Sequence, residues 1–379
     1  MTTKPLGIAI LGAGIFAREA HLPAIATLSK SSLLKLEAVY SRSLSSSSKL
    51  AELATSTLNL SSSQQVQVYS DDGSGKGLDD LLARSDIHAV IVVLPILQQP
   101  EVIVKAFKAG KHVLSEKPIG KDVKTALELI KLYESEYKPK GLLWRIAENF
   151  ECESGVVAAA EAVSSGAIGR VAFFKLSSVG AMVQDNQYYQ TSWRTVPEYQ
   201  GGFLLDGGVH YTAILRTVLS DPIVSATGHA SLTKEHLPPH DTIQSILQTS
   251  SGAHGIFELS FALPIGGEYA STVVEITGTT GFVKLSLTSK ATEEGRDPKP
   301  HYIVKVVGQD GTEKVTEFLS DGVEKEVEYF AKAVLGVKDD PVGQGKGDPR
   351  GAVRDVAIIQ ASLTSNGNLV DVKALVEGS

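Results

Sequence analysis

Gly12-Ala13-Gly14-Ile15-Phe16-Ala17 decides the fold, because it lies between a short apolar run, Ile8–Leu11, and a segment of helical character, Ala17–Ser29. It has the form G-x-G-x-x-A, in which glycines allow a tight turn and close approach of the backbone to a pyrophosphate. The following helix N-terminus supplies N–H donors. A tight turn without a ligand is the alternative. The place of the motif in the first strand–helix–strand unit favours a dinucleotide site formed by Gly12, Gly14, Ile15 and Phe16.

The first third of the chain alternates short apolar runs with amphipathic segments, a pattern typical of parallel strands joined by helices. The expected strands are Ile8–Leu11, Leu36–Tyr40, Val66–Tyr69, Ala89–Leu94 and His112–Leu114. The expected helices are Ala17–Ser29, Ser48–Thr57, Leu78–Arg84, Gln99–Ala109 and Lys121–Tyr137. The serine-rich patches Ser41–Ser48 and Ser61–Ser63 are expected to be solvated loops, because serine adds little to a core.

After about residue 150 the pattern changes to segments with a period of two, which predict a largely antiparallel sheet. These segments are Val171–Ser177, Val224–Ser231, Thr242–Thr249, Gly255–Phe261, Thr272–Thr277, Phe282–Leu287 and His301–Val307. Helices are expected at Gly155–Ser165, Phe203–Leu219, Val323–Leu335 and Arg350–Ser365.

We therefore expect an α/β chain of two domains. Residues 1–145 would form a doubly wound parallel sheet of the Rossmann type that binds a dinucleotide. Residues 146–379 would form an α+β domain with a large, mostly antiparallel open sheet that serves substrate binding and oligomerisation. We expect the terminal helices to return to the first domain.

Composition excludes several classes of protein. The 379 residues include 36 basic and 43 acidic side chains, a net charge of −7, without a basic run that would follow a phosphate backbone. No segment reaches the roughly 20 apolar residues that span a bilayer. Cys152 is the single cysteine, so no intrachain disulfide is expected. We expect a cytoplasmic protein with a small-molecule substrate and neither a nucleic-acid nor a membrane partner.

No metal site is expected either. The pair His236 and His240 has the spacing of helical metal ligands, but Pro238 and Pro239 between them forbid a helix.

The end of the second strand indicates the cofactor, since an NAD site usually has an acidic residue there that accepts from the ribose 2′-hydroxyl. Here the strand runs into Ser41 and Arg42 instead. A hydroxyl and a guanidinium suit a 2′-phosphate, so NADP is preferred and NAD is the alternative. An ordinary solvated arginine is the structural alternative for Arg42.

Glu116-Lys117-Pro118 follows the fifth expected strand. A lysine at the carboxyl end of such a strand projects into the crevice where doubly wound sheets bind ligands. Desolvation beside a nicotinamide ring would favour a lysine that exchanges protons near neutral pH, whereas pairing with Glu116 would oppose this. A solvated turn is the alternative.

The block Phe203–His210 places Asp206 and His210 four residues apart, on one face if the segment is helical. A carboxylate and an imidazole together can orient a substrate hydroxyl and share its proton. A helix N-terminus with a structural histidine is the alternative, but Gly207 and Gly208 would cost a purely structural helix about 1 kcal/mol each.

Together, the glycine motif, the run Ala109–Pro118 and the stretch from Trp193-Arg194 to His210 resemble the glucose–fructose oxidoreductase, inositol dehydrogenase and MocA (Gfo/Idh/MocA) family over nearly the whole chain. The resemblance implies hydride transfer between NAD(P) and a sugar, polyol or related carbonyl compound. It implies acid/base catalysis by Lys117, with Asp206 and His210 near the reacting carbon. Trp193 and Arg194 match positions near the active site.

The loop after the fourth expected strand departs from the family pattern, whereas a later asparagine agrees with it. Where the family often reads Thr-Pro-Asn with a histidine three residues later, this chain has Leu94 and Pro95, and Gln99 replaces the histidine. Asn149 matches an asparagine near the cofactor. The resemblance thus adds a set of cofactor contacts: Leu94, Pro95, Gln99, Glu116, Lys117, Asn149, Trp193 and Arg194.

The expected function is an NADP-dependent oxidoreductase acting on a small polar carbonyl or hydroxyl compound of the sugar, uronate or polyol class. Two alternatives remain: a non-catalytic regulatory protein that senses NAD(P), and an NAD-linked sugar or polyol dehydrogenase. A homodimer through the C-terminal sheet is expected, as in many relatives.

Overall fold

The computed structural model describes residues 4–61, 64–72, 76–264, 272–290, 299–338 and 340–377. The chain divides into two compact units. The first comprises Met1–Gly120, Glu128–Asn149 and Val323–Pro349, and the second Lys121–Leu127, Phe150–Gly322 and Arg350–Ser379. The chain thus returns to the first unit after most of the second.

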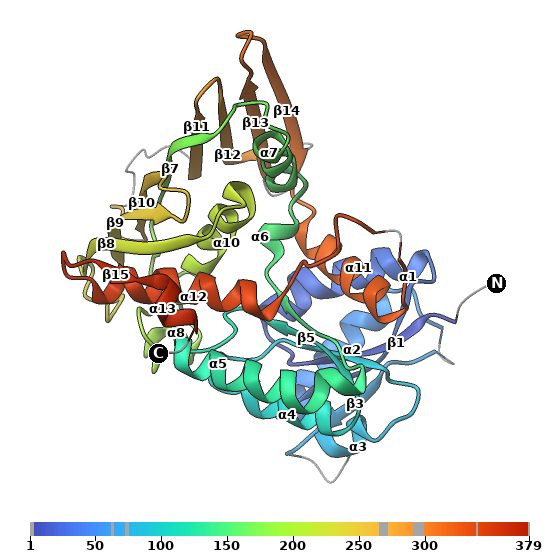
Figure 1. The fold of residues 1–379 in the computed structure, drawn as a ribbon. Helices are drawn as coiled ribbons and strands as arrows, with labels where there is room; N and C mark the ends of the chain where they lie inside the picture. Colours follow the sequence, from blue (N-terminus) through green and yellow to red (C-terminus); the bar gives the residue numbers. More distant parts are fainter. Residues whose placement is uncertain are drawn as a thin grey trace. The chain divides into compact units, whose positions relative to one another are not determined.

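A parallel sheet of six strands forms the centre of the first unit, in the order β3-β2-β1-β4-β5-β6 (Figure 1). Its strands are β1 (Leu6–Leu11), β2 (Leu34–Ser41), β3 (Gln67–Ser70), β4 (Ala89–Val92), β5 (His112–Glu116) and β6 (Trp144–Ala147). Every residue of β1 is buried, as expected of a central strand covered by helices on both faces. The first five strands were predicted, with β4 ending two residues earlier than expected.

The helices of the parallel sheet alternate with its strands. They are α1 (Leu22–Lys30), α2 (Leu44–Thr57), α3 (Leu78–Leu82), α4 (Gln99–Lys108) and α5 (Val123–Leu132), with π-helical turns at η1 (Ala17–His21) and η2 (Tyr133–Tyr137) and a 3-10 turn at η3 (Lys138–Lys140). A later helix, α11 (Gly322–Val334), packs into the same core, where Val327 and Phe330 join Ile8, Ile10 and Ile25.

The prediction of a loop at Ser41–Ser48 was wrong. The Ser43 side chain accepts a hydrogen bond from the Ser46 N–H, and α2 begins at Leu44. Ser47 is fully buried, and its hydroxyl is satisfied by the carbonyls of Ser43 and Leu44. The serines therefore cap and build the first turn of a helix. In the second patch Ser61 is exposed outside any helix, and Ser62 and Ser63 lie outside the described residues.

The second unit contains a sheet of nine strands in the order β14-β13-β12-β11-β7-β10-β9-β8-β15. These strands are β7 (Val171–Val179), β8 (Ile223–Ser231), β9 (Thr242–Thr249), β10 (His254–Ser260), β11 (Thr272–Gly278), β12 (Phe282–Lys290), β13 (Lys299–Val307), β14 (Glu313–Leu319) and β15 (Val370–Asp371). All neighbours pair antiparallel except β7 and β10, which are parallel. The predicted fold class, a Rossmann-type parallel sheet plus a mostly antiparallel open sheet, is confirmed.

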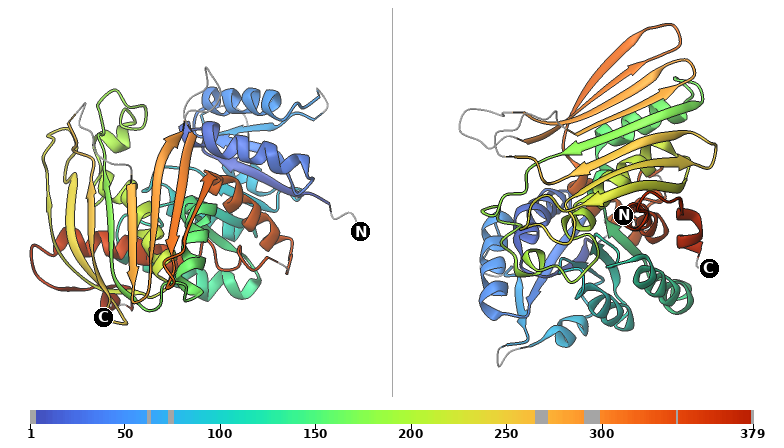
Figure 2. Two further views of the ribbon diagram at one scale, coloured as in Figure 1. Left: turned by 90° about the horizontal axis from the view of Figure 1, so that it is seen from above. Right: turned by 90° about the vertical axis from the view of Figure 1, so that its left-hand side faces the viewer.

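Helices cover one face of this open sheet. The second unit has α6 (Asn149–Cys152), α7 (Ser154–Ser164), α8 (Ser192–Thr195), α9 (Phe203–Asp206), α10 (Gly208–Leu219), α12 (Pro349–Thr364) and α13 (Val372–Glu377). Helix α7 packs on β12, β13 and α10 (Figure 2). Along β9, residues alternate between buried and exposed positions, so the opposite face of the sheet is open. Among the described residues, no helix has the length and apolar character needed to cross a membrane.

Candidate functional site

The glycine motif forms the loop after β1, at the point where the strand order reverses. Strands β2 and β3 lie on one side of β1 and β4 to β6 on the other, so the carboxyl ends of β1 and β4 flank a topological switch point. Gly12 has a φ of 121°, and a Cβ atom there would lie 2.0 Å from the Val93 carbonyl oxygen. Only glycine fits this position. A Cβ atom on Gly14 would meet nothing within 4 Å, so the loop presents its backbone openly.

Ile15 and Phe16 begin the helix that continues through η1 into α1. Its N-terminal N–H groups therefore lie at the switch point, the arrangement that binds a pyrophosphate in dinucleotide sites. The residues of the loop fit an NAD(P) pyrophosphate, and the bound cofactor would donate or accept the hydride. The Phe16 ring contacts the buried His21 ring edge-on, with centroids 5.3 Å apart.

Ser41 ends β2, and Arg42 is exposed next to it. The structure adds two acidic residues that the sequence analysis did not consider here, Asp71 and Asp72, from the loop after β3. The Tyr40 hydroxyl donates to the Asp71 carboxylate, and burial together with this bond raises the pKa of Tyr40. The Asp72 N–H donates to the Arg42 carbonyl at 3.2 Å, and the Asp72 carboxylate accepts from the Leu44 N–H at 2.7 Å.

The loop after β4 carries Leu94 and Pro95, and Leu94 approaches Gly12, since a Cβ on that glycine would lie 3.3 Å from a Leu94 methyl. Gln99 is the first residue of α4 and is 3% exposed. Its Nε2 atom has no hydrogen-bond partner among the described residues. A buried amide donor of this kind is costly unless it meets an acceptor, so Gln99 retains the capacity to contact a ligand.

Glu116 ends β5, Lys117 follows it, and Asn149 lies just beyond β6. Because the strands are parallel, the loops after β1, β4, β5 and β6 all lie at one edge of the sheet. The structure thus brings the predicted contacts of the first unit to one edge. Lys117 is half-buried there, whereas Glu116 is 7% exposed.

In the second unit, Asp206 and Arg194 form a buried ion pair. Arg194 Nε donates to the Asp206 carboxylate at 2.6 Å, and the guanidinium lies 4.0 Å from the Trp193 ring centroid. Asp206 is 5% exposed. Trp193 and Arg194 were predicted as cofactor contacts. The structure places Arg194 on the Asp206 carboxylate and the Trp193 ring against the Arg194 guanidinium.

Tyr199 is a neighbour of this pair that sequence reasoning missed. Its side chain is 6% exposed, and its hydroxyl has no hydrogen-bond partner among the described residues. Burial and the negative charge of Asp206 raise the pKa of Tyr199, so its hydroxyl remains a donor. No motif marks Tyr199, because it follows an irregular segment without periodicity.

The predicted continuous helix Phe203–Leu219 is interrupted at Gly207, which separates α9 from α10. A Cβ atom on Gly207 would lie 3.0 Å from the Phe261 ring, and one on Gly208 would lie 2.8 Å from Leu259. The glycines therefore allow close packing on the sheet. His210, in the first turn of α10, stacks on Phe150 with ring centroids 4.3 Å apart. Asp206 and His210 belong to different helices but remain near neighbours in the chain.

A half-buried arginine, Arg216, holds α10 in place. Arg216 forms two hydrogen bonds of 2.9 Å to Asp355 on α12 and an ion pair of 2.8 Å with Glu151 on α6. Burial alone would lower the pKa of Arg216, but Asp355 and Glu151 raise it well above its usual value. Ion pairs thus join α10, which carries His210, to α12 and α6, and removal of one charged partner would leave the others uncompensated.

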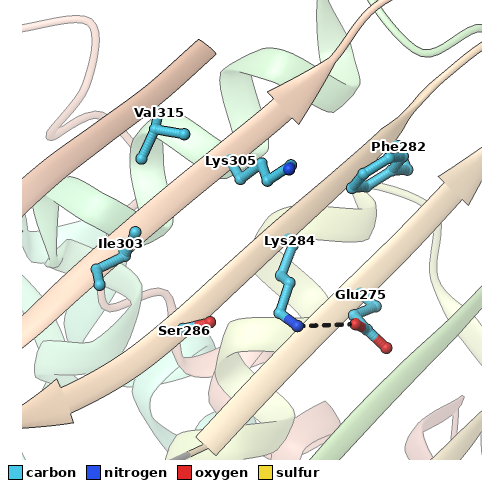
Figure 3. A pocket seen from close by; sticks show the side chains of 7 residues that line it. All are labelled: Glu275, Phe282, Lys284, Ser286, Ile303, Lys305 and Val315. Atoms are coloured by element: carbon cyan, nitrogen blue, oxygen red, sulfur yellow. Dashed lines mark ion pairs between the residues drawn. The ribbon is translucent and has the colours of Figure 1, made fainter. Parts of the chain in front are cut away.

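A hollow on the open face of the second sheet lies among strands β11 to β14 (Figure 3). Its lining includes Phe282, Ile303 and Val315, with an ion pair of 3.2 Å between Lys284 and Glu275. No residue predicted as catalytic or cofactor-binding lines this hollow.

A Rossmann-type unit with a glycine loop at its switch point, followed by an open-sheet unit, is the architecture of a nicotinamide-dependent oxidoreductase. Residues 6–139 match the model of the oxidoreductase family with an NAD-binding Rossmann fold, and residues 156–284 match that of the GFO/IDH/MocA C-terminal domain. The chain belongs to the Gfo/Idh/MocA family of oxidoreductases, enzymes that act on hydroxyl and carbonyl groups.

Several relatives match this chain over nearly its whole length. The dehydrogenase FPY6 of Fusarium mangiferae is 40% identical over 371 residues, covering 95% of this chain and 96% of that one. The dTDP-3,4-didehydro-2,6-dideoxy-alpha-D-glucose 3-reductase of Streptomyces violaceoruber is 27% identical over 98% of this chain and 95% of that one. The crystal structure of an oxidoreductase from Thermotoga maritima superposes with a TM-score of 0.79 at 30% identity, covering 98% and 99% of the two chains.

Proposed function

We propose that the protein is an NADP-dependent oxidoreductase that transfers a hydride between nicotinamide and a small polar carbonyl or hydroxyl compound of the sugar, uronate or polyol class. Arg42 is the observation that carries the cofactor preference. It lies exposed after β2, next to Ser41 and the N-terminus of α2. A guanidinium and a hydroxyl together suit a 2′-phosphate.

Asp71 and Asp72 favour the second candidate, an NAD-linked dehydrogenase, because they bring negative charge close to Arg42. Both carboxylates already accept protein hydrogen bonds, from Tyr40 and Leu44 respectively. They are therefore less available to a ribose hydroxyl than a carboxylate at the end of β2 would be. This supports the preference for NADP over NAD.

Lys117, Asp206 and His210 are proposed as the catalytic residues. Lys117 or His210 would protonate the oxygen of the reduced carbonyl, and Asp206 would accept a hydrogen bond from a neighbouring substrate hydroxyl. Arg194 fixes the Asp206 carboxylate in one orientation, and Phe150 fixes the plane of the His210 ring. Held side chains of this kind lose little freedom when a substrate binds. The sugar class also agrees with the Streptomyces relative, a reductase of a dTDP-bound dideoxyglucose.

The test measures oxidation of NADPH, with NADH in parallel, against pools of aldoses, ketoses, uronates and dicarbonyl compounds. We expect turnover with NADPH, and the active pool identifies the substrate class. Arg42→Ala should weaken NADPH binding about tenfold to hundredfold while NADH binding is unchanged, because only the 2′-phosphate bond is lost. Asp72→Asn is the matched control and should leave NADPH binding equal or tighter. If Arg42→Ala leaves the affinity for NADPH unchanged, the NAD-linked candidate is favoured.

A further inference from the structure

Three buried side chains of the first unit meet beside the Lys117 turn: His21 from η1, Glu116 from β5 and Glu326 from α11. They are 0%, 7% and 4% exposed. One ligand-type atom from each lies within 4.8 Å of the others. The dinucleotide motif uses none of the three side chains directly, and the sequence analysis did not bring His21 or Glu326 into any site.

Two members of the cluster, His21 and Glu116, have the geometry of a hydrogen bond rather than of two ligands on one metal ion. His21 Nε2 lies 2.6 Å from a Glu116 carboxylate oxygen. Two ligands bound to one Zn²⁺ at about 2.0–2.2 Å would lie roughly 3 Å or more apart. The short separation therefore indicates a charge-assisted N–H to carboxylate bond. A buried carboxylate needs a hydrogen-bond donor, and His21 supplies one to Glu116. Glu326 adds a second buried carboxyl group within 4.8 Å.

Packing holds His21 rigidly. It is fully buried, it follows the glycine loop by one helical segment, and its ring contacts Phe16 edge-on. Its Nδ1 atom has no hydrogen-bond partner among the described residues, so Nε2 to Glu116 is the polar bond that orients the ring. Glu326 is fixed through α11, whose Val327 and Phe330 are part of the core beneath β1.

We propose that His21 and Glu326 are positioning residues for Lys117, acting through the side chain of Glu116. Glu116 is the last residue of β5, so a fixed Glu116 side chain fixes the direction in which the next residue leaves the strand. A helix that follows most of the second unit in the sequence would thus set the placement of the catalytic lysine. The inference rests on the catalytic role of Lys117 stated above.

The test uses the full chain and needs no substrate. Acetic anhydride at trace concentration labels amino groups, and mass spectrometry gives the labelling rate of Lys117 relative to the exposed Lys314 on β14. We expect His21→Asn and Glu326→Gln to change this ratio by about threefold or more, because a loosened turn alters the surroundings of the amine. Lys111→Met is the control. Lys111 is also buried in the first unit, but it lies just before the start of β5, at the opposite end of the strand from Glu116. Its ammonium donates to the carbonyls of Arg84 and Ile87.

An unchanged ratio in folded His21→Asn and Glu326→Gln proteins would overturn the proposal, and so would an equal change in Lys111→Met. A stoichiometric metal in the purified wild-type protein that both cluster variants lose would also overturn it, since a ligand sphere would then hold the cluster. If His21→Asn does not fold, the nearly isosteric Glu326→Gln decides.

A second readout separates this proposal from the proposed function. With an active substrate, turnover of Glu326→Gln should fall about tenfold while NADPH affinity changes less than about twofold. If the wild-type protein turns over no substrate, the proposed function fails, and the labelling comparison still decides the role of the cluster.

Discussion

At the end of β5, the buried carboxylate of Glu116 is followed directly in the sequence by the half-buried amine of Lys117. Glu116 is directed to His21, while Lys117 is the first residue beyond the strand. Successive side chains of an extended chain point to opposite sides, so the two residues can serve different purposes. The buried residue anchors the turn, and the following lysine remains near the edge where the glycine loop lies.

Replacing Lys117 tests the chemistry directly. Lys117→Ala should lower turnover by about 10² to 10⁴ with NADPH binding retained, because general acid–base catalysis is lost while the glycine loop is intact. Steady-state kinetics and fluorescence titration of NADPH measure the two effects. Lys121→Ala, at an exposed lysine four residues later, should change neither quantity. Wild-type turnover in Lys117→Ala would remove the lysine from the mechanism.

The candidate site could be predicted from the sequence where a local motif carries it. Gly12, Gly14 and Lys117 lie at strand ends that short patterns identify. The side chains that contact other site residues could not be predicted, because only tertiary packing brings such pairs together. Arg194 meets Asp206 across an irregular segment, and Glu326 meets Glu116 only because α11 returns to the first unit. Single-sequence periodicity contains no information on such pairs.

At the scale of elements, the strands that were found are those with a buried face. In β9 every second residue is buried, and the predicted bounds agree with the structure. Strand β14 (Glu313–Leu319) was missed because none of its residues is buried, and its apolar residues do not alternate regularly with polar ones. Strands β6 (Trp144–Ala147) and β15 (Val370–Asp371) were also missed. The serine-rich start of α2 was read as a loop because serine propensity favours caps and turns, and here the cap and the helix adjoin.

Helix α7 begins after a buried acid whose charge costs stability. Glu153 is 1% exposed, and its carboxylate accepts hydrogen bonds from the Ser320 hydroxyl at 2.7 Å and the Asp321 N–H at 2.9 Å. Burial raises the pKa of Glu153 despite these bonds. In the unfolded chain a glutamate has a pKa of about 4.3, and in the folded protein the pKa of Glu153 is higher. The contribution of this group to folding stability is therefore greatest below the unfolded pKa and is lost as pH rises through the folded pKa.

Glu153→Gln should therefore stabilise the protein at pH 8 and have little effect near pH 4. The amide keeps an acceptor for one of the two donors and removes the buried charge. Urea unfolding followed by circular dichroism at both pH values measures the difference. Glu161→Gln, at an exposed position of the same helix, should be neutral throughout. A destabilised Glu153→Gln at pH 8 would show that the charged hydrogen bonds outweigh burial.

At the scale of the whole molecule, the open face of the second sheet carries exposed apolar side chains, which none of the described helices covers. Phe173, Ile246 and Ile256 are 54%, 58% and 52% exposed, and Ile246 and Ile256 are directly paired between β9 and β10. Lys175 and Glu275 are paired on neighbouring strands of the same sheet, so both signs of charge are present. A two-fold interface needs a self-complementary surface of this kind, which supports the proposal of a homodimer through this sheet.

A charge placed in the apolar centre of that face should separate the subunits. Ile256→Glu would bury a carboxylate beside its symmetry-related copy, and the desolvation and repulsion make the dimer unfavourable. Light scattering after size exclusion should give a dimer for the wild type and a monomer for Ile256→Glu. Leu369→Glu, at an apolar side chain that is 73% exposed outside the sheet face, should remain dimeric. A monomeric wild type would remove the dimer proposal, whereas a dimeric Ile256→Glu would place the interface on another surface of the chain.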